Sequence, residues 1–281
     1  MHKTFGDFLL CCYNTGEIEV NMKKVVIITG ASSGIGLCTA KMLTLKGYKV
    51  YGIARDDFHT EEFSCYQSDV NDSKRIREIF EEVFGLEGRI DVVINNAGFG
   101  IAGAMEHTSE DKIDAIFKTN LTAVVKISAL AVKYLRKTKG RIINISSVAG
   151  VMPIAFQSCY SATKAGVLNY SRALDGEIRR FGIRVTALLP GDLKTGFTAA
   201  RLIDNEDEGY EGHVAKSIKR MERDEQTGKG PEVVAKAIVK LLKKKNPPTK
   251  YVVGGTYKFL VFLNRLLPTR LVDAILRKMY A

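Results

Sequence analysis

The sequence predicts an α/β fold, in which a doubly wound parallel sheet of about seven strands carries helices on both faces. Two observations indicate it. Short runs of β-branched residues alternate along the chain with apolar segments of helical period. The first such run, residues 23–29, leads through a glycine-rich turn directly into a helical segment at 35–43. Strand, tight turn and helix in that order are typical of the units from which parallel sheets are built.

The later elements follow the same alternation. Residues 49–54 form the second predicted strand, residues 91–98 a buried strand that opens into a turn, and residues 140–146 a further strand. No obvious linker interrupts the pattern. A chain of 281 residues with 46% hydrophobic content is long enough to bury one sizeable core, so we expect a single domain.

Cysteine and histidine usage argues against structural disulfides and metals. The five cysteines are odd in number and form no Cys-x-x-Cys pair, and the chain has four histidines. We therefore expect a cytoplasmic protein without a metal site. Cys159 lies beside Tyr160, but without a recognisable histidine partner it is interpreted as a packing residue.

The net charge of +11 is concentrated near the C-terminus. Residues 231–281 contain eleven Lys or Arg residues against Glu232 and Asp273. A solvated basic face is the first interpretation, an anionic membrane surface the second and nucleic acid a distant third, so no nucleic-acid partner is expected.

Residues 1–21 are predicted to be an extension outside the fold, because they show no long helical or strand period. The apolar run at 8–13 is too short for a membrane span and lacks the cleavage site of a signal peptide. We hypothesise that Met22 is the natural start. Glu19-Val20 can be encoded by GAG-GTG, which resembles a bacterial ribosome-binding site, and peptides from residues 1–21 in protein from the native host would contradict the hypothesis.

The glycine-rich turn predicts a phosphate-binding site. Glycine lets the backbone approach a phosphate without a Cβ in the way, and the following helix supplies unpaired N–H groups and a positive dipole end. A tight turn without a ligand is the alternative, since a lone glycine pattern is weak evidence. The residues expected to contact a dinucleotide here are Gly30, Ser32, Ser33, Gly34, Ile35 and Gly36.

The end of the second strand distinguishes between the two nicotinamide dinucleotides. An acidic residue there would hold a free ribose 2′-hydroxyl, whereas Arg55 favours a 2′-phosphate. We expect NADP(H), with NAD(H) as the alternative, because Asp56 and Asp57 either pair with Arg55 or turn into solvent. After another short strand, the pair Asp69 and Val70 is expected to lie at the adenine, with a hydrogen bond to its amino group.

Ser147, Tyr160 and Lys164 predict proton-transfer chemistry. A free tyrosine has a pKa of about 10 and is a poor acid/base near neutrality unless a nearby positive charge stabilises its phenolate. Lys164 follows Tyr160 by four residues, so a helix places both on one face. Ser147 follows the strand at 140–146 and would hydrogen-bond a substrate oxygen as hydride arrives, after which Tyr160 donates the proton.

Together these motifs resemble the short-chain dehydrogenase/reductase family, from Met22 to about Gly255. The resemblance implies a Rossmann-type catalytic domain over residues 22–256, with residues 257–281 as a basic amphipathic extension. The matching residues, in family order, are Thr29-Gly-x-x-x-Gly-x-Gly36, Asn95-Asn-Ala-Gly98, Asn120, Ser147, Tyr160-x-x-x-Lys164 and Pro190-Gly191 with Thr195.

The resemblance also implies roles for single residues. Asn120 would hold a water that relays protons to Lys164, and Lys164 would bind the nicotinamide ribose; a helix-stabilising side chain is the alternative for Asn120. Asn95 is expected to brace the sheet. Ser147, rather than Ser146, has the family's spacing to the tyrosine. The remaining cofactor contacts implied are Asn96, Ala97 and Gly98, and, around the nicotinamide carboxamide, Pro190, Gly191 and Thr195.

Apolar residues at 148–156, with Phe99 and Ile101, suggest a lipophilic carbonyl or secondary alcohol, and ordinary packing explains them equally well. The polar segment 197–230 corresponds to the family's variable substrate lid. The tail after Gly255 resembles those of the hydroxysteroid- and retinol-dehydrogenase-like branch. It is interrupted too often by basic residues to span a bilayer, so core packing is its first interpretation, and a cover over the substrate mouth or peripheral membrane contact is the alternative.

The sequence thus predicts an NADP(H)-dependent oxidoreductase that interconverts a ketone and a secondary alcohol. A homodimer or homotetramer is expected by resemblance, through the helices that carry Asn120 and Tyr160. The rival hypotheses are a non-catalytic dinucleotide-binding regulator, which would leave the reactive side chains without a role, and a membrane-surface scaffold that uses only the tail.

Overall fold

The computed structural model describes residues 23–197, 199–203 and 208–280, so the predicted extension 1–21 and the predicted start at Met22 lie outside the described residues. The strands are β1 (Val25–Thr29), β2 (Lys49–Ala54), β3 (Ser64–Gln67), β4 (Val92–Asn95), β5 (Ile101–Ala102), β6 (Arg141–Ile145), β7 (Arg184–Leu189), β8 (Leu202–Ile203) and β9 (Lys250–Val252). The helices are α1 (Gly34–Leu45), α2 (Ser73–Glu87), α3 (Glu110–Phe117), α4 (Ala123–Thr138), α5 (Ser158–Ile178), α6 (His213–Gln226), α7 (Glu232–Leu242), α8 (Gly255–Leu266) and α9 (Thr269–Tyr280).

Seven strands form one parallel sheet in the order β3-β2-β1-β4-β6-β7-β9. The chain builds outward from β1 first to one side and then to the other, so the strand order reverses between β1 and β4. An open sheet of this kind binds ligands beyond the carboxyl ends of its strands at that reversal. The predicted doubly wound sheet is confirmed.

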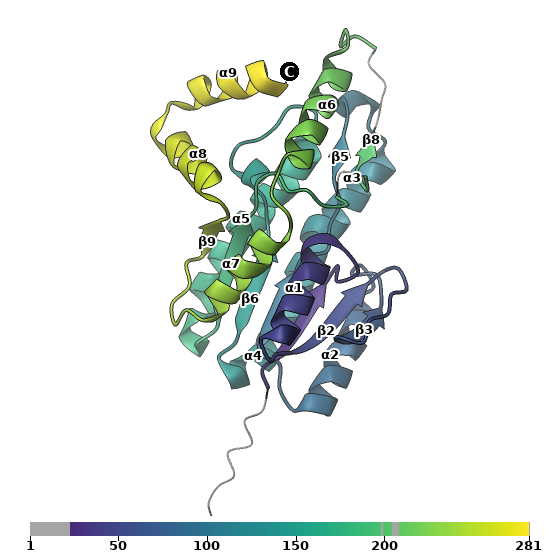
Figure 1. Cartoon of the computed structure of the whole chain (residues 1–281), viewed down its shortest axis with the longest axis vertical. Helices are drawn as coiled ribbons and strands as arrows, with labels where there is room; N and C mark the ends of the chain where they lie inside the picture. The colour runs from purple at the N-terminus through teal and green to yellow at the C-terminus, as the bar shows by residue number, and fades with distance from the viewer. Residues whose placement is uncertain (1–22, 198, 204–207, 281) are drawn as a thin grey trace, which may run out of the picture.

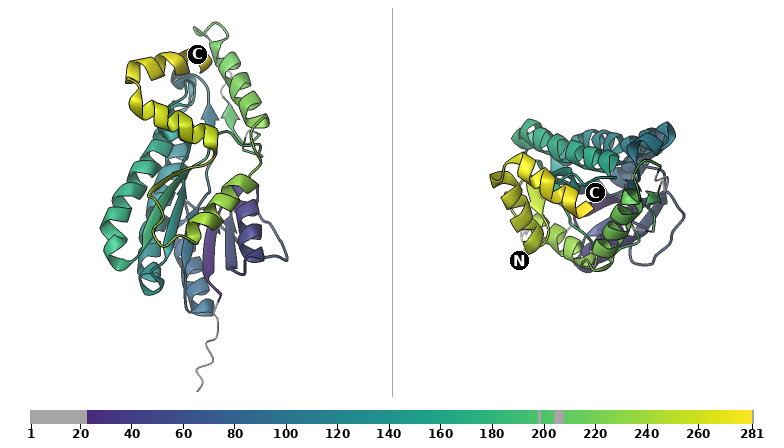
Figure 2. Two further views of the ribbon diagram at one scale, coloured as in Figure 1. Left: turned by 60° about the vertical axis from the view of Figure 1, so that its left-hand side comes forward. Right: turned by 90° about the horizontal axis from the view of Figure 1, so that it is seen from above.

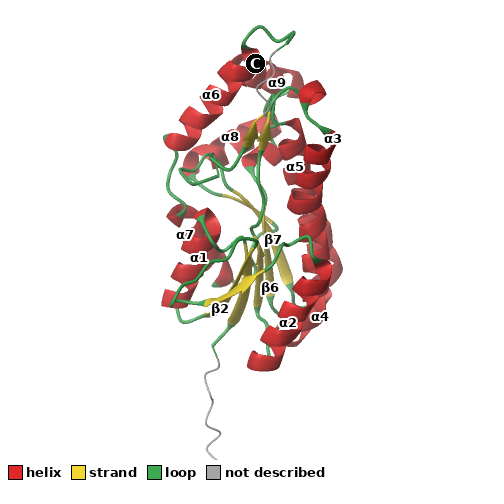
Figure 3. Cartoon of the chain, turned by 90° about the vertical axis from the view of Figure 1, so that its right-hand side faces the viewer, coloured by secondary structure: helices red, strands yellow, loops and turns green. Residues whose placement is uncertain are grey.

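Helices cover both faces of the sheet (Figure 1 and Figure 3). Helices α2, α4 and α5 pack with the sheet in one core cluster, and α1 and α7 pack on the opposite face in another. All five residues of β1 are buried. Because both faces of a parallel sheet are covered, its central strands are continuous apolar runs rather than alternating ones.

The sequence determines where several helices begin and end. Asp72 caps α2 by accepting hydrogen bonds from the N–H groups of Lys74 and Arg75, and Gly88 ends it with φ of 68°. Between α3 and α4 the chain makes a π-helical turn, residues 118–122, which carries Asn120. The continuous helical stretch at 110–138 is long and apolar enough to cross a bilayer by composition, but its α4 part packs with the sheet in a core cluster.

Two parts of the structure rise beyond the carboxyl end of the sheet. The small parallel pair β5–β8 was not predicted; it joins the segment after β4 to Leu202 and Ile203. Helices α8 and α9 form a hairpin that leaves β9 and turns back toward α6 (Figure 2). Val261 of α8 packs in a cluster with Leu189 and Val252, and Tyr280 of α9 packs in one with Met221. The tail therefore returns to the body of the protein at both of its ends.

Candidate active site

A cavity of about 240 Å³ lies beyond the carboxyl ends of the central strands. Most of the sequence-predicted site residues come together around it. Those that line it are Gly30, Ser32, Ser33, Gly34, Ile35, Asn96, Ala97, Gly98, Ser147, Tyr160, Lys164, Pro190, Gly191 and Thr195. The predicted residues that do not line it are Gly36, Arg55, Asp69, Val70 and Asn120.

The turn between β1 and α1 is held against the turn after β4. The Thr29 hydroxyl accepts hydrogen bonds from the backbone N–H groups of Asn96 (3.0 Å) and Ala97 (3.1 Å). The Asn96 amide in turn donates to the carbonyls of Thr29 (3.0 Å) and Gly30 (3.1 Å). A Cβ at Gly36 would overlap the Gly30 carbonyl, so this position accepts only glycine without rearrangement.

The same turn presents the start of α1 to the cavity. Gly30 has φ of 66°, and the N-cap residue Ser33 makes no side-chain hydrogen bond to the first turn of the helix. The N–H groups of that turn therefore remain available, with the positive end of the helix dipole, for an anionic ligand. Tight glycine packing and open donors fit the pyrophosphate of a dinucleotide.

The residues expected around the adenosine half lie at the ends of the neighbouring strands. Arg55 follows β2, is 77% exposed and pairs with Asp56 at 3.3 Å, while Asp57 pairs with His59 at 3.3 Å. Of the two arrangements left open for the acidic neighbours, the structure has the paired one at Asp56. Asp69, beyond β3, accepts from the Asn71 N–H at 2.8 Å.

Ser146 and Ser147 have different surroundings at the end of β6. Ser146 is buried and donates to the carbonyl of Lys164 at 2.7 Å, so it links β6 to α5. Ser147 lines the cavity, accepts from the Ala149 N–H at 3.1 Å and is also hydrogen-bonded to the Tyr160 side chain. Ser146 also lines the cavity, but its hydroxyl proton is donated to the Lys164 carbonyl, whereas the Ser147 hydroxyl faces Tyr160.

Tyr160 and Lys164 share one face of α5, as their spacing requires. The Lys164 ammonium lies 5.6 Å from the centre of the Tyr160 ring and donates to the Ile145 carbonyl at 3.0 Å. Burial raises the pKa of Tyr160 to about 12, which outweighs the opposite effect of the Ser147 hydrogen bond. Burial also lowers the pKa of Lys164 to about 8. The expectation of a depressed tyrosine pKa is therefore not met, because desolvation dominates there.

Asn120 and Asn95 are both buried, and both side chains form hydrogen bonds within the protein. The Asn120 Oδ1 accepts from the Phe99 N–H at 3.0 Å, and its Nδ2 donates to the Phe99 carbonyl at 2.8 Å. This arrangement fixes the turn after β4, and the water-relay role of Asn120 stays a prediction. Asn95 donates to Ser128 (3.0 Å) and Asn144 (2.8 Å), so its predicted role as a sheet brace is confirmed.

The outer wall of the cavity was only partly foreseen. Val148, Ala149 and Ile154 line it, as predicted for the 148–156 segment. Phe99 and Ile101 do not line it, because β5 turns this segment away to pair with β8. Apolar lining residues that the sequence did not single out include Phe197, Met221 and Tyr280.

A polar group beside these apolar residues was also missed. Asp192 lines the cavity, and its carboxylate accepts from the Tyr257 hydroxyl at 2.5 Å. Glu225 lines the cavity from α6 and pairs with the buried Arg201. Both carboxylates act to raise the pKa of Tyr160, so they lie within electrostatic range of it. Asp192 directly follows the Pro190-Gly191 motif, but its partner Tyr257 comes from the tail, and Glu225 comes from α6, so no local pattern marks either carboxylate as part of the cavity.

Within the described residues, no group of His, Cys, Asp or Glu side chains is arranged to hold a metal ion. Cys159 is half-buried and its sulfur lies 3.4 Å from that of Met105, away from the cavity lining. The thiol packs as expected.

The family model for the short chain dehydrogenases matches residues 24–206, which hold the glycine turn, Ser147, Tyr160 and Lys164. The chain belongs to the short-chain dehydrogenase/reductase family. Its relatives are named as reductases and dehydrogenases of this family, so the protein is an NAD(P)-dependent oxidoreductase.

Relatives of this enzyme match most of its length. A 3-ketodihydrosphingosine reductase of Bacteroides thetaiotaomicron is 39% identical over 264 residues, which cover 92% of this chain and 98% of the relative. A 3-oxoacyl-(acyl-carrier-protein) reductase of Salmonella typhimurium is 33% identical over 186 residues, which cover 63% of this chain and 76% of the relative. The solved structure of a short-chain dehydrogenase from Streptomyces avermitilis has a TM-score of 0.79 at 28% identity, covering 92% of this chain and 96% of that one.

Proposed function

We propose that the enzyme is an NADP(H)-dependent reductase of a long-chain amino ketone of the 3-ketodihydrosphingosine type. The observation that carries the proposal is the 39% identity to a reductase of that name over nearly the full length of both chains. The cavity supports it chemically. It combines apolar side chains with a carboxylate, Asp192, that forms no ion pair among the described residues.

The proposed substrate carries an alkyl chain and an amino group on the carbon next to the ketone. The amine is a cation near neutral pH, and a carboxylate close to Tyr160 would bind it while Ile154, Phe197 and Met221 contact the chain. An acyl chain without an amine would leave the half-buried Asp192 carboxylate without a cationic partner, with the Tyr257 hydroxyl as its hydrogen-bond donor. This argument favours the amino ketone over a plain oxoacyl group.

The cofactor assignment follows the residues around the cavity. The glycine turn and the start of α1 would hold the pyrophosphate, and Arg55 would leave Asp56 to bind a 2′-phosphate. Asn96, Ala97 and Gly98 would lie along its middle, and Pro190, Gly191 and Thr195 beside the carboxamide. Asp69 and Val70 would contact the adenine. When bound, the cofactor supplies the hydride. NADP(H) is preferred over NAD(H) in this proposal because of Arg55.

The chain's own residues would provide the proton. Burial holds the Tyr160 phenol in its protonated form at neutral pH, and because an alkoxide is the stronger base, it would take the phenol proton. Ser147 would hydrogen-bond the ketone oxygen, and Lys164, still largely cationic at pH 7, would stabilise the phenolate after transfer. Asn120 would act by fixing the turn at Phe99 beneath the site.

Several further assignments belong to the same proposal. Residues 22–256 form the catalytic domain, residues 257–281 extend it, and the protein works in the cytoplasm as a homodimer or homotetramer with peripheral membrane contact. Ketones of the steroid and retinoid type remain the second candidate substrates, from the resemblance of the tail. A non-catalytic regulator remains the rival, and it gives Ser147, Tyr160 and Lys164 no task.

The test compares NADPH consumption with 3-ketodihydrosphingosine and with its N-acetyl derivative, which has the same chain but no positive charge. We expect the free amine to be preferred by wild-type protein, and Asp192→Asn to reduce kcat/KM for the amine by roughly tenfold to a hundredfold. The value for the N-acetyl ketone should change little. Asp111→Asn, at an exposed position on α3, is the matched charge control. Equal losses on both substrates would show that Asp192 only supports the fold.

A further inference from the structure

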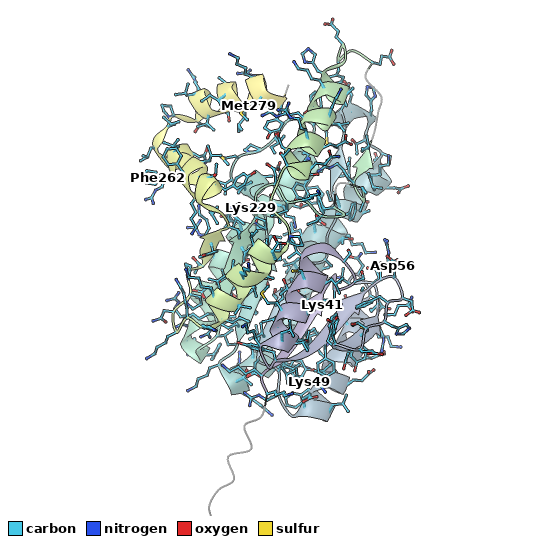
Figure 4. The ribbon with its side chains drawn as sticks, in the orientation of Figure 1. Lys41, Lys49, Asp56, Lys229, Phe262 and Met279 are labelled. Carbon is cyan, nitrogen blue, oxygen red and sulfur yellow. The ribbon has the colours of Figure 1, made fainter. Side chains whose placement is uncertain are left out.

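The C-terminal hairpin exposes most of the large apolar side chains found on the surface. Of the eleven such side chains exposed among the described residues, seven lie on α8 and α9, and Leu266 at 62%, Phe259 at 60% and Phe262 at 57% are the most exposed of them. We call the seven the tail face: Phe259, Leu260, Phe262, Leu266, Leu271, Ile275 and Met279. The hairpin stands at the edge of the molecule, with Phe262 on α8 and Met279 on α9 (Figure 4). Soluble proteins rarely expose a concentration of this kind without a binding function.

The tail face is interspersed with positive charge. Five exposed Lys or Arg residues lie on the two helices, against one acidic residue, Asp273. None of the five takes part in an ion pair among the residues that the structure describes, and Lys258 lies 5.0 Å above the Tyr251 ring. The other four are Arg265, Arg270, Arg277 and Lys278.

The body of the protein holds the hairpin by its other residues. Tyr257, Val261, Val272 and Tyr280 face inward: Tyr257 donates to Asp192, and Tyr280 donates to Asp224 of α6 at 3.2 Å. The tail face is therefore not a core surface that has failed to pack. It remains outside after the two helices have made their contacts with the body.

We propose that α8 and α9 dock on an anionic lipid bilayer, with the tail face in the boundary between headgroups and acyl chains and the five basic residues on the phosphates. Amphipathic helices with apolar and basic residues bind membrane surfaces in this way. Helix α9 also contributes Tyr280 to the cavity wall, so the docking surface and the substrate cavity share one helix. A keto lipid would thus meet the enzyme beside the bilayer that dissolves it.

A second copy of the chain is a poorer occupant of this surface. A two-fold contact would place the same five basic residues of both copies opposite one another, where like charges repel. An anionic bilayer matches both the apolar side chains and the charge. The docking stands independently of the substrate assignment, because it rests on the surface alone.

The test is sedimentation of the full chain with vesicles, compared between phosphatidylcholine alone and phosphatidylcholine with phosphatidylglycerol. We expect binding to the anionic vesicles, weakened by salt. The double variant Phe262→Ser/Leu266→Ser should lose roughly tenfold or more of this binding, and so should Arg270→Gln/Arg277→Gln. The matched control is Leu45→Ser/Leu86→Ser, which removes two exposed leucines from α1 and α2 and should bind like wild type.

All variants must unfold at the wild-type temperature and reduce a detergent-dispersed ketone at the wild-type rate. This turnover is measured without vesicles, so failure of the proposed function and failure of docking are separate results. The proposal is overturned if wild-type protein stays in the supernatant with anionic vesicles, or if the tail and control variants bind equally. It is also overturned if the tail variants change only the oligomeric state, which would make the tail face a contact between copies.

Discussion

Substituting Gly191 by alanine tests how the tail is fastened to the active site. The new methyl carbon would lie closer than 3.0 Å to three atoms of the Tyr257 ring, a separation that real side chains essentially never show. The ring must therefore move, and its hydrogen bonds to Asp192 must lengthen or break. Overpacking of this kind costs about 1–3 kcal/mol. About 2 kcal/mol corresponds to a fall in Tm of roughly 4–8 °C for a chain of this size.

The assay is thermal and denaturant unfolding of Gly191→Ala in two backgrounds. In wild type the substitution should reduce the free energy of unfolding by about 2 kcal/mol, whereas in Tyr257→Ala, where the obstructing ring is gone, it should cost close to nothing. Gly85→Ala is the control, because Gly85 is exposed on α2 with nothing within 4 Å, and it should be neutral or slightly stabilising. An equal cost in both backgrounds would refute the contact between Tyr257 and the Gly191 turn.

Two further predictions concern charge. Burial lowers the pKa of Lys164 to about 8, so the unfolded chain binds more protons between that pH and about 10.4. The free energy of unfolding of wild type relative to Lys164→Met should therefore rise with pH across this window, by up to about 3 kcal/mol. Denaturant titrations of both proteins at the lower and upper ends of the pH window measure this difference. A difference that falls with rising pH would contradict the burial of Lys164. Arg55→Ala should weaken NADPH binding roughly tenfold to a hundredfold and leave NADH binding unchanged, as followed by nucleotide fluorescence. Asp56→Asn, which frees Arg55, should not weaken NADPH binding. Equal losses of NADPH and NADH affinity in Arg55→Ala would show that Arg55 does not bind the 2′-phosphate.

The parts of the site that follow from local sequence were predictable. The glycine turn and the spacing of Tyr160 and Lys164 depend on residues a few positions apart. Helical period alone places Lys164 beside Tyr160. The sheet was predictable for a similar reason, because the β-branched runs of its central strands are buried on both faces.

The outer wall of the cavity depends on contacts that no local pattern records. Tyr257 reaches Asp192 across 65 positions of the chain, and Tyr280 reaches Asp224 across 56. The sequence showed an amphipathic tail but not which of its residues turn inward. The pKa of Tyr160 was misjudged for a related reason: its desolvation depends on the packing of the whole site, whereas the sequence revealed only the neighbouring lysine.

The most direct test of the central claim is NADPH consumption with 3-ketodihydrosphingosine by wild type and by Tyr160→Phe, with NADPH affinity measured on both proteins. We predict turnover by wild type, a loss of roughly a hundredfold to ten-thousandfold in Tyr160→Phe, and similar NADPH affinity for the two. Full turnover by Tyr160→Phe would contradict its role as proton donor. Tight NADPH binding by wild type without turnover of this or any other ketone tested would favour the regulator instead.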